Sequence, residues 1–288
     1  MESYKEVVRR VLKYGKVKEN RTGVDAISVA GGYIEHDMST GFPMLTTKKM
    51  AYRLMACELE FFIKGITDKQ WLLDRNNHIW DEWCSPLKVP YGHDEETLAK
   101  MKAERDLGPI YGFQWRHFDA PYKGYDHDYT NEGVDQLVKL VETLRNDPKD
   151  RRMIVSAWNP KQLHEMALPP CHYGYEVTVI DGKINLLWSQ RSVDVALGLP
   201  FNLGVYGTLL HLLCLETGLE EGNLIGLLGD VHIYKPHIEK IEMQIEREVY
   251  ELGKIVTENF ISLFDWEHTD SKVVGYESHE KIVFEIAV

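Results

Sequence analysis

Long apolar stretches and an excess of positive charge are both missing from this sequence of 288 residues. No run approaches the roughly 18 apolar residues of a membrane span, and the opening MESYKEVVRR has no apolar signal-peptide core. The formal net charge of −12 is the opposite of what a general nucleic-acid binder needs. We therefore expect a cytoplasmic protein with no membrane and no DNA partner, in which any anionic ligand meets a local group of arginines.

Cysteine is scarce as well. The four cysteines, Cys57, Cys84, Cys171 and Cys214, form no CxxC pair and have no histidine spacing suited to zinc. With 44% hydrophobic residues, the chain can fill a sizeable core without disulfides. We expect all four thiols to be reduced and expect no metal site. Repeats, low-complexity tracts and linkers are absent too, which predicts a single domain over residues 1–288.

The clearest local signal is a β-hairpin. Residues 177–180 and 183–187 are rich in β-branched and aliphatic side chains, and Asp181-Gly182 between them is typical of a two-residue hairpin turn. Other segments have apolar residues at helical or alternating spacing. They predict helices at residues 2–14, 50–64, 133–146, 161–166, 202–217 and 239–250, and strands at 26–37, 153–157 and 281–288.

The hairpin brings a thiol close to a cation. If Ile180 pairs with Lys183, the register places Cys171 opposite Ser192 and next to Arg191. A neighbouring guanidinium favours the thiolate, which is the nucleophilic form of cysteine. Cys171 is therefore a candidate nucleophile, and the alternative is that it is one more small buried hydrophobe, as most free cysteines are.

Glu58 is a candidate proton carrier. Its neighbours one turn away on the predicted helix are apolar, so its carboxyl emerges from an apolar face. Such a site disfavours the charged form and lets the group hold a proton near neutral pH. The alternative is a buried glutamate satisfied by one hydrogen-bond partner. Glu60, two residues on, has a mixed set of neighbours and is interpreted as an ordinary helix-edge charge.

Asn202 begins the predicted helix at 202–217, which is apolar on nearly all sides and should therefore be buried in the centre of a domain. Asparagine is a favoured N-cap, so this residue has a purely structural interpretation. Its amide also both donates and accepts, which suits reading the edge of a pyrimidine.

Several motifs appear in a fixed order along the chain: NRTG (20–23), GFPMLTTKK (41–49), Glu58, IWDEW (79–83), GPIYGFQWR (108–116), RRMIVSAWN (151–159), LPPCH (168–172), QRSVDVALGLPFN (190–202) and GDVHIYKPHI (229–238). Together they resemble the thymidylate synthase family. The resemblance implies an α/β (α+β) fold in which a large mixed β-sheet packs against a buried central helix and surrounding helices. It also implies a small surface insertion at about residues 85–107, where we place no chemistry.

The family reaction transfers a one-carbon unit from 5,10-methylenetetrahydrofolate to C5 of dUMP, with hydride transfer giving dTMP and dihydrofolate. The resemblance assigns catalytic roles to Cys171, Glu58, Asn202, Arg191, Tyr111, His172 and Asp194. It assigns substrate binding to Arg21, Arg151, Arg152, Gln190, Arg191, Ser192, Asn202, His232 and Tyr234. It assigns folate binding to Lys48, Ile79, Trp80, Trp83, Asp194, Gly198, Phe201 and Val288.

In this family the arginine pair equivalent to Arg151 and Arg152 crosses the subunit interface to the neighbour's substrate phosphate. The resemblance therefore implies a homodimer with shared active sites. Adjacent arginines are otherwise usually surface charges, and a tryptophan pair such as Trp80 and Trp83 is more often core than ligand site.

Three other functions fit parts of the sequence. A deoxyuridylate hydroxymethylase of the same fold would capture the methylene intermediate with water, giving 5-hydroxymethyl-dUMP and tetrahydrofolate. Trp80 and an apolar EIAV tail that can cover the site favour the synthase. A catalytically silent member of the family would bind nucleotide or its own messenger RNA as a regulator. The intact Cys171, Glu58 and Asn202 count against this function. A cysteine hydrolase is less favoured, because the adjacent Cys171 and His172 point to opposite faces of a strand.

Overall fold

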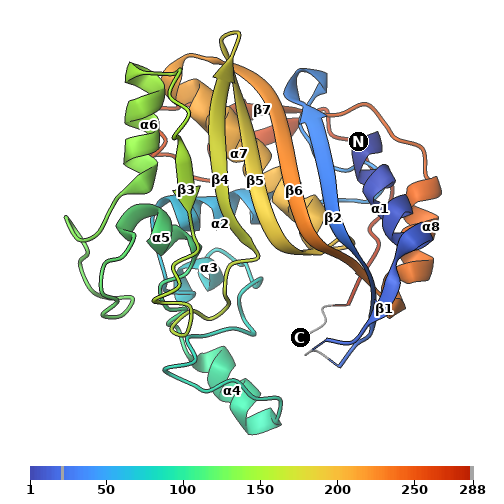
Figure 1. The fold of residues 1–288 in the computed structure, drawn as a ribbon, viewed down its shortest axis with the longest axis horizontal. Coiled ribbons are helices and arrows are strands. Elements are labelled where there is room, and N and C mark those ends of the chain that lie inside the picture. Colours follow the sequence, from blue (N-terminus) through green and yellow to red (C-terminus); the bar gives the residue numbers. More distant parts are fainter. Residues whose placement is uncertain (21–22, 286–288) are drawn as a thin grey trace.

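A large mixed sheet organises the fold (Figure 1). The computed structural model describes residues 1–20 and 23–285. Its main sheet has six strands in the order β1-β2-β6-β5-β4-β3, and only the β5–β6 pair is parallel. The strands are β1 (Lys16–Lys18), β2 (Ala26–Asp37), β3 (Ile154–Ser156), β4 (His172–Ile180), β5 (Lys183–Asp194) and β6 (Glu220–Tyr234). The mixed sheet expected from the sequence is confirmed.

Helices cover one face and one edge of this sheet. Figure 1 shows α7 and α2 behind the sheet and α1 beside α8 at its β1 end. The helices are α1 (Glu2–Tyr14), α2 (Tyr52–Ile63), α3 (Gln70–Leu73), α4 (Glu95–Ala103), α5 (Tyr111–His117), α6 (Gln136–Asn146), α7 (Gly198–Thr217) and α8 (Ile238–Glu246). Short 3-10 helices η1 (Met38–Thr40) and η2 (Lys235–His237) and a separate strand pair, β7 (Lys254–Thr257) with β8 (Ser271–Val274), complete the described elements.

The predicted buried central helix is α7. Its side chains from Asn202 to Cys214 are all buried, because the sheet lies on one side and α2 on the other. Within the described residues, α7 is also the one helix long and apolar enough to cross a membrane. The expectation drawn from uninterrupted apolar runs in the sequence missed this helix, which qualifies by its length and mean hydropathy. In the fold, 83% of its most apolar stretch is buried.

The hairpin turn forms as predicted, but its register changes near the open end. Asp181 and Gly182 both have positive φ values, 51° and 77°, and Ile180 pairs with Lys183. A bulge between His172 and Gly174 then shifts the pairing by one residue. The backbone N–H of Arg191 consequently donates to the Cys171 carbonyl at 2.8 Å, so the expected position of Cys171 opposite Ser192 is wrong.

Two predicted elements do not form. Residues 161–166, predicted as a short helix, are a series of turns. There the buried Gln162 side chain donates to the Ala120 carbonyl and accepts from Gln114, so tertiary hydrogen bonds override local helix propensity. The predicted terminal strand is absent over residues 281–285, and its remaining positions lie outside the described residues.

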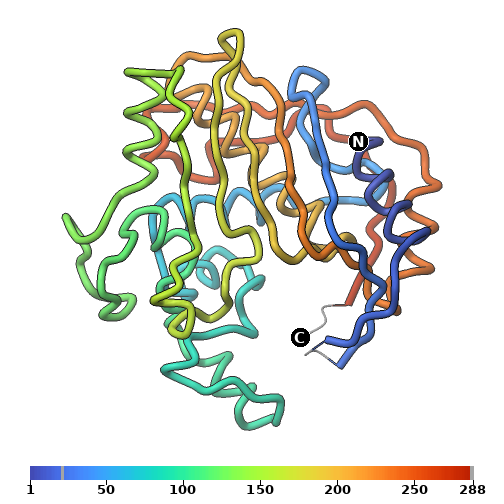
Figure 2. Tube along the Cα trace, viewed as in Figure 1, coloured from blue at the N-terminus to red at the C-terminus, as the bar shows by residue number. Residues whose placement is uncertain are grey.

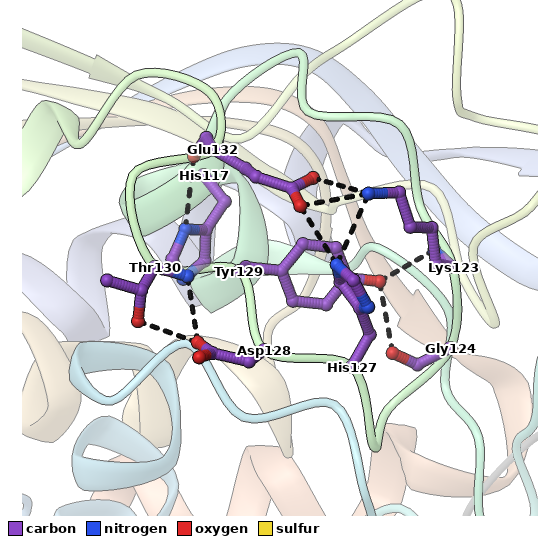
Figure 3. Close-up of polar contacts among 8 residues, drawn as sticks. All are labelled: His117, Lys123, Gly124, His127, Asp128, Tyr129, Thr130 and Glu132. Carbon is purple, nitrogen blue, oxygen red and sulfur yellow. Dashed lines mark hydrogen bonds and ion pairs between the residues drawn. The ribbon is translucent and has the colours of Figure 1, made fainter.

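Residues 118–134 form a surface loop that is held together by side chains (Figure 3). An antiparallel bridge between Phe118 and Val134 closes it. The hydroxyl of Tyr129 accepts from Lys123 N at 2.6 Å and donates to Gly124 O at 3.0 Å. The Tyr129 ring packs edge-on against Phe113 of α5 at 4.8 Å. The loop therefore holds α5, whose first residue is Tyr111, in place.

Candidate active site

A cleft of about 1040 Å³ opens where β5 ends and α7 begins. Most of the side chains selected from the sequence line it. They are Glu58, Ile79, Trp80, Trp83, Tyr111, Cys171, His172, Gln190, Arg191, Ser192, Asp194, Gly198, Phe201, Asn202, His232 and Tyr234. The volume is at the upper end of that of a single drug-sized pocket, so the cleft has room for more than one small ligand.

Cys171 sits just before β4 in a loop that Arg191 braces. The Arg191 Nε donates to Pro170 O at 2.9 Å, and its Nη2 donates to Pro169 O at 2.6 Å. The same Nη2 lies 4.0 Å from the Cys171 Sγ. The thiol is partly exposed, lines the cleft and has this guanidinium beside it. All four cysteines are free thiols, as expected.

Tyr111 and His172 pack behind the loop that carries Cys171. The backbone N–H of Cys171 donates to the Tyr111 hydroxyl at 2.8 Å. The Tyr111 ring stacks on Phe62 at 4.9 Å and lies 4.4 Å from the His172 ring. Burial lowers the pKa of His172 to about 3, and its Nδ1 is hydrogen-bonded to the Tyr206 hydroxyl at 2.7 Å. His172 is therefore a neutral, buried packing and hydrogen-bonding group.

Glu58 projects from α2 into the cleft and has the environment that its neighbours predicted. Burial raises the pKa of Glu58 to about 7, against the opposing effect of a hydrogen bond from Trp80. In that bond the Trp80 Nε1 donates to Oε1 at 2.9 Å. A carboxyl with this pKa can both give up and accept a proton near neutral pH.

Glu60 is not the helix-edge charge inferred from the sequence. It is 1% exposed and accepts from Lys64 Nζ at 2.5 Å and from the backbone N–H of His268 at 2.9 Å, and its Oε2 is 2.7 Å from the His268 Nδ1. Burial would raise the pKa of Glu60, but these hydrogen bonds outweigh it and lower the pKa to about 2. Glu60 thus joins His268, near the C-terminal end of the chain, to α2.

Asn202 lies inside α7, because the helix begins four residues earlier than predicted, at Gly198. The N-cap interpretation is therefore wrong, and the side chain is a buried cleft residue. The start of α7 is instead supported by Asp194, whose Oδ1 accepts from Ala196 N at 2.9 Å and from Leu197 N at 3.2 Å. Asp194 also lines the cleft.

The polar wall comes from β5 and β6, which run in parallel. Gln190 and Ser192 lie on β5, and His232 and Tyr234 lie on β6, where residues two apart face the same side. The rings of His232 and Tyr234 are 5.2 Å apart. Asp194 is the register partner of His232. The two strands therefore bring five polar or aromatic side chains to one wall.

Some selected residues lie elsewhere. Arg152 is 87% exposed at its side chain and pairs with Asp150 at 2.7 Å, and Arg151 beside it is exposed too. Neither lines the cleft of its own chain. Lys48 is buried and donates to Ala196 O at 2.5 Å, and burial lowers its pKa to about 8. The remaining two, Arg21 and Val288, lie outside the described residues.

The cleft also contains residues that the sequence did not single out. Trp158, just after β3, places its ring 5.7 Å from the Arg191 guanidinium. It belongs to the RRMIVSAWN motif, so the motif itself was the available signal. Pro86 and Tyr91 come from the segment where no chemistry was expected, and no local pattern marks them.

A thiol braced by a guanidinium, sharing one cleft with a carboxyl of near-neutral pKa and a buried amide, defines a site for covalent nucleophilic chemistry with proton transfer. The family model described as thymidylate synthase matches residues 2–288, so the chain belongs to the thymidylate synthase family.

Individual relatives agree with this assignment. A bifunctional dihydrofolate reductase-thymidylate synthase from Paramecium tetraurelia is 40% identical over 99% of this chain and 61% of the relative. Proteins of the same description from Leishmania major and Leishmania amazonensis are 42% and 40% identical over 99% of this chain and 55% of each relative. The chain thus spans between half and two thirds of the length of these curated relatives.

Proposed function

We propose that this chain methylates dUMP, using 5,10-methylenetetrahydrofolate as co-substrate and releasing dTMP and dihydrofolate. The observation that carries the proposal is the convergence of Cys171, Glu58 and Asn202 in one cleft beside Arg191. Family membership across residues 2–288 supports it. The relatives named for thymidylate synthase match over 99% of this chain.

The proposed chemistry begins at the thiol. The Cys171 thiolate forms a bond to C6 of the uracil, and the electrons of the C5–C6 double bond move towards O4 to give an enolate. Asn202 can donate to O4 while accepting from N3–H, which stabilises the developing charge. The now nucleophilic C5 bonds to the one-carbon unit, and Glu58 accepts the C5 proton. The bond from the one-carbon unit to the folate then breaks, which leaves an exocyclic methylene on C5. The released tetrahydrofolate gives a hydride to this methylene and becomes dihydrofolate, and the C6–Sγ bond breaks to release dTMP and the Cys171 thiolate.

The lining of the cleft supports a proposed place for each of the two ligands. Arg191 and Ser192 on β5 suit the nucleotide phosphate, because a guanidinium matches phosphate oxygens in geometry and charge. His232 and Tyr234 suit the ribose hydroxyl. Ile79, Trp80 and Trp83 on one side and Gly198 and Phe201 on the other suit a flat aromatic folate, for which Asp194 provides a polar partner. Arg21 and Val288 are proposed to complete these two subsites.

A homodimer with shared sites is part of the proposal. Arg151 and Arg152 lie near the edge strand β3, outside their own cleft, where they are available to a second copy. The sheet face opposite α7 exposes apolar side chains, including Tyr33 (54%) and its register partner Leu227 (40%). Covering this face with a second copy would bury them and bring the two arginines to the neighbouring cleft.

Chromatography of the reaction products tests the proposal. Purified protein incubated with dUMP and methylenetetrahydrofolate should yield dTMP and dihydrofolate in equal amounts. Formation of 5-hydroxymethyl-dUMP with tetrahydrofolate would show that water captures the intermediate and would replace the proposal by the hydroxymethylase. Binding of dUMP without any product would refute the catalytic proposal altogether.

A further inference from the structure

Residues 85–107 form a lobe that projects away from the sheet, with α4 at its far end (Figures 1 and 2). The two ends of the lobe are joined, because Ser85 N donates to Asp106 O at 2.7 Å. We expected this insertion to take no part in the site, but the structure places part of it at the cleft. Pro86 and Tyr91 of this lobe line the cleft.

Tyr91 extends an aromatic wall that starts at the floor of the cleft. Trp80, 7% exposed, is hydrogen-bonded to Glu58 at the floor. Trp83 follows one turn later, and its ring stacks with Tyr91 at a centroid distance of 6.0 Å and an interplanar angle of 15°. His93 then meets Tyr91 edge-on at 5.1 Å. With 40% of its surface exposed, Tyr91 marks the rim.

A buried lysine fixes this geometry. Lys69 is 1% exposed, and its Nζ donates to three backbone carbonyls: Asp81 at 3.1 Å, Trp83 at 2.9 Å and Met101 at 2.8 Å. The first two carbonyls belong to the turn that carries the tryptophans, and the third belongs to α4. One ammonium therefore ties the turn that carries Trp83 to α4 of the lobe, and Tyr91 lies on the chain between these two attachment points.

We propose that Tyr91 is a further binding residue for the folate co-substrate and contacts its p-aminobenzoyl-glutamate part. This inference rests on the proposed function. The carbon to be transferred must lie at the floor, near Cys171 and Glu58. The glutamate end carries carboxylates that are costly to bury, so it must point to the open rim. The aryl group between the two ends then passes the wall made by Trp83 and Tyr91.

Steady-state kinetics of Tyr91 variants test the inference. Loss of an aromatic contact worth about 0.5–1.5 kcal/mol should raise the folate KM of Tyr91→Ala roughly 2- to 12-fold. The KM for dUMP and kcat should stay within about twofold of wild type, because the ring is 40% exposed at the rim and Cys171 and Glu58 are left unchanged. Tyr91→Phe keeps the ring and should restore the wild-type folate KM. The matched control is Tyr125→Ala, which removes a tyrosine of similar exposure (37%) that lies against Arg105 and outside the cleft.

Inhibition by fragments of the folate tests which part of it Tyr91 contacts. Inhibition by p-aminobenzoyl-glutamate should weaken in Tyr91→Ala, whereas inhibition by a tetrahydropterin without the aryl group should not change. A folate KM that stays at the wild-type value in Tyr91→Ala, or one that rises equally in Tyr125→Ala, would overturn the inference while leaving the proposed function intact. If wild-type protein makes no dTMP, tetrahydrofolate binding is measured by tryptophan fluorescence with dUMP present. Weaker binding to Tyr91→Ala alone would then support the contact, and equal or absent binding would overturn it.

Discussion

Replacing Glu58 with glutamine should change how the stability of the protein depends on pH, in addition to removing turnover. Burial raises the folded-state pKa of Glu58 to about 7, whereas its ordinary value is 4.5. Between these two values the folded protein binds a proton that the unfolded chain has lost. The free energy of unfolding must therefore fall as the pH rises from about 4.5 through about 7.

The size of this effect follows from the gap between the two pKa values. A gap from 4.5 to about 7 corresponds to about 3 kcal/mol when the carboxyl is fully ionised. Integrated between pH 5 and pH 8.5, the wild-type protein loses about 2.5 kcal/mol through this one group. Glutamine does not titrate, so Glu58→Gln should gain about 2.5 kcal/mol relative to wild type over that interval.

Urea unfolding of both proteins at the two pH values, followed by tryptophan fluorescence, measures this difference, and other titrating groups cancel in it. Leu59→Ala is the matched control on the same helix. Leu59 is fully buried and does not titrate, so the cost of truncating it should be nearly equal at pH 5 and pH 8.5. A Glu58→Gln difference that is also independent of pH would refute the assignment of a near-neutral pKa to Glu58.

Three further predictions concern the chemistry. Cys171→Ala should fold but not turn over, and mass spectrometry with 5-fluoro-dUMP and methylenetetrahydrofolate should find the covalent adduct on the Cys171 peptide and on no other cysteine. Asn202→Asp should move the preference from dUMP towards dCMP by one or two decades in competitive binding, because mismatched buried hydrogen bonds cost about 1–3 kcal/mol; an unchanged ratio would deny Asn202 any role in reading the base. Mixing Arg152→Ala with Cys171→Ala chains should restore activity through one intact composite site per heterodimer, and a mixture that stays inactive after verified subunit exchange would argue against shared sites.

Elements whose residues repeat with a clear period were predictable. The helix at Glu2–Tyr14 and the strand at Ala26–Asp37 have the bounds inferred from the sequence. The helix buries one face at helical spacing, and the strand alternates between buried and exposed residues towards its end. The apolar character of α7 on all sides also indicated its central position. The start of α7 was misplaced by four residues, since the N-cap position is Leu197, which has no capping side chain, and Asp194 accepts only from the two backbone groups just before the helix.

The chemistry of the site was predictable where a single motif or helix face carries it. Burial raises the pKa of Glu58, and its apolar helical neighbours, which are local in sequence, indicated that burial. Glu60 was misinterpreted because its partner His268 comes from 208 residues further along the chain. Tyr91 was missed for the same reason, since its place in the cleft depends on Lys69 joining the lobe to the turn that contains Trp83. Contacts of this kind have no periodic trace in the sequence.

The bulge before Gly174 shows how such a non-local feature bears on the chemistry. Counting from the Asp181-Gly182 turn places Ser192 opposite Cys171. The bulge adds one residue to β4, so that Arg191 lies opposite Cys171 instead. The backbone of Arg191 then holds the Cys171 carbonyl, while its side chain holds the two preceding carbonyls and lies 4.0 Å from Sγ. One residue therefore fixes the nucleophile loop through backbone and side chain together. Without the bulge, the backbone N–H of Ser192 would lie opposite the Cys171 carbonyl. Arg191 would then be one position further along the strand with its side chain on the other side of the sheet, and its guanidinium would have to reach the thiol from there.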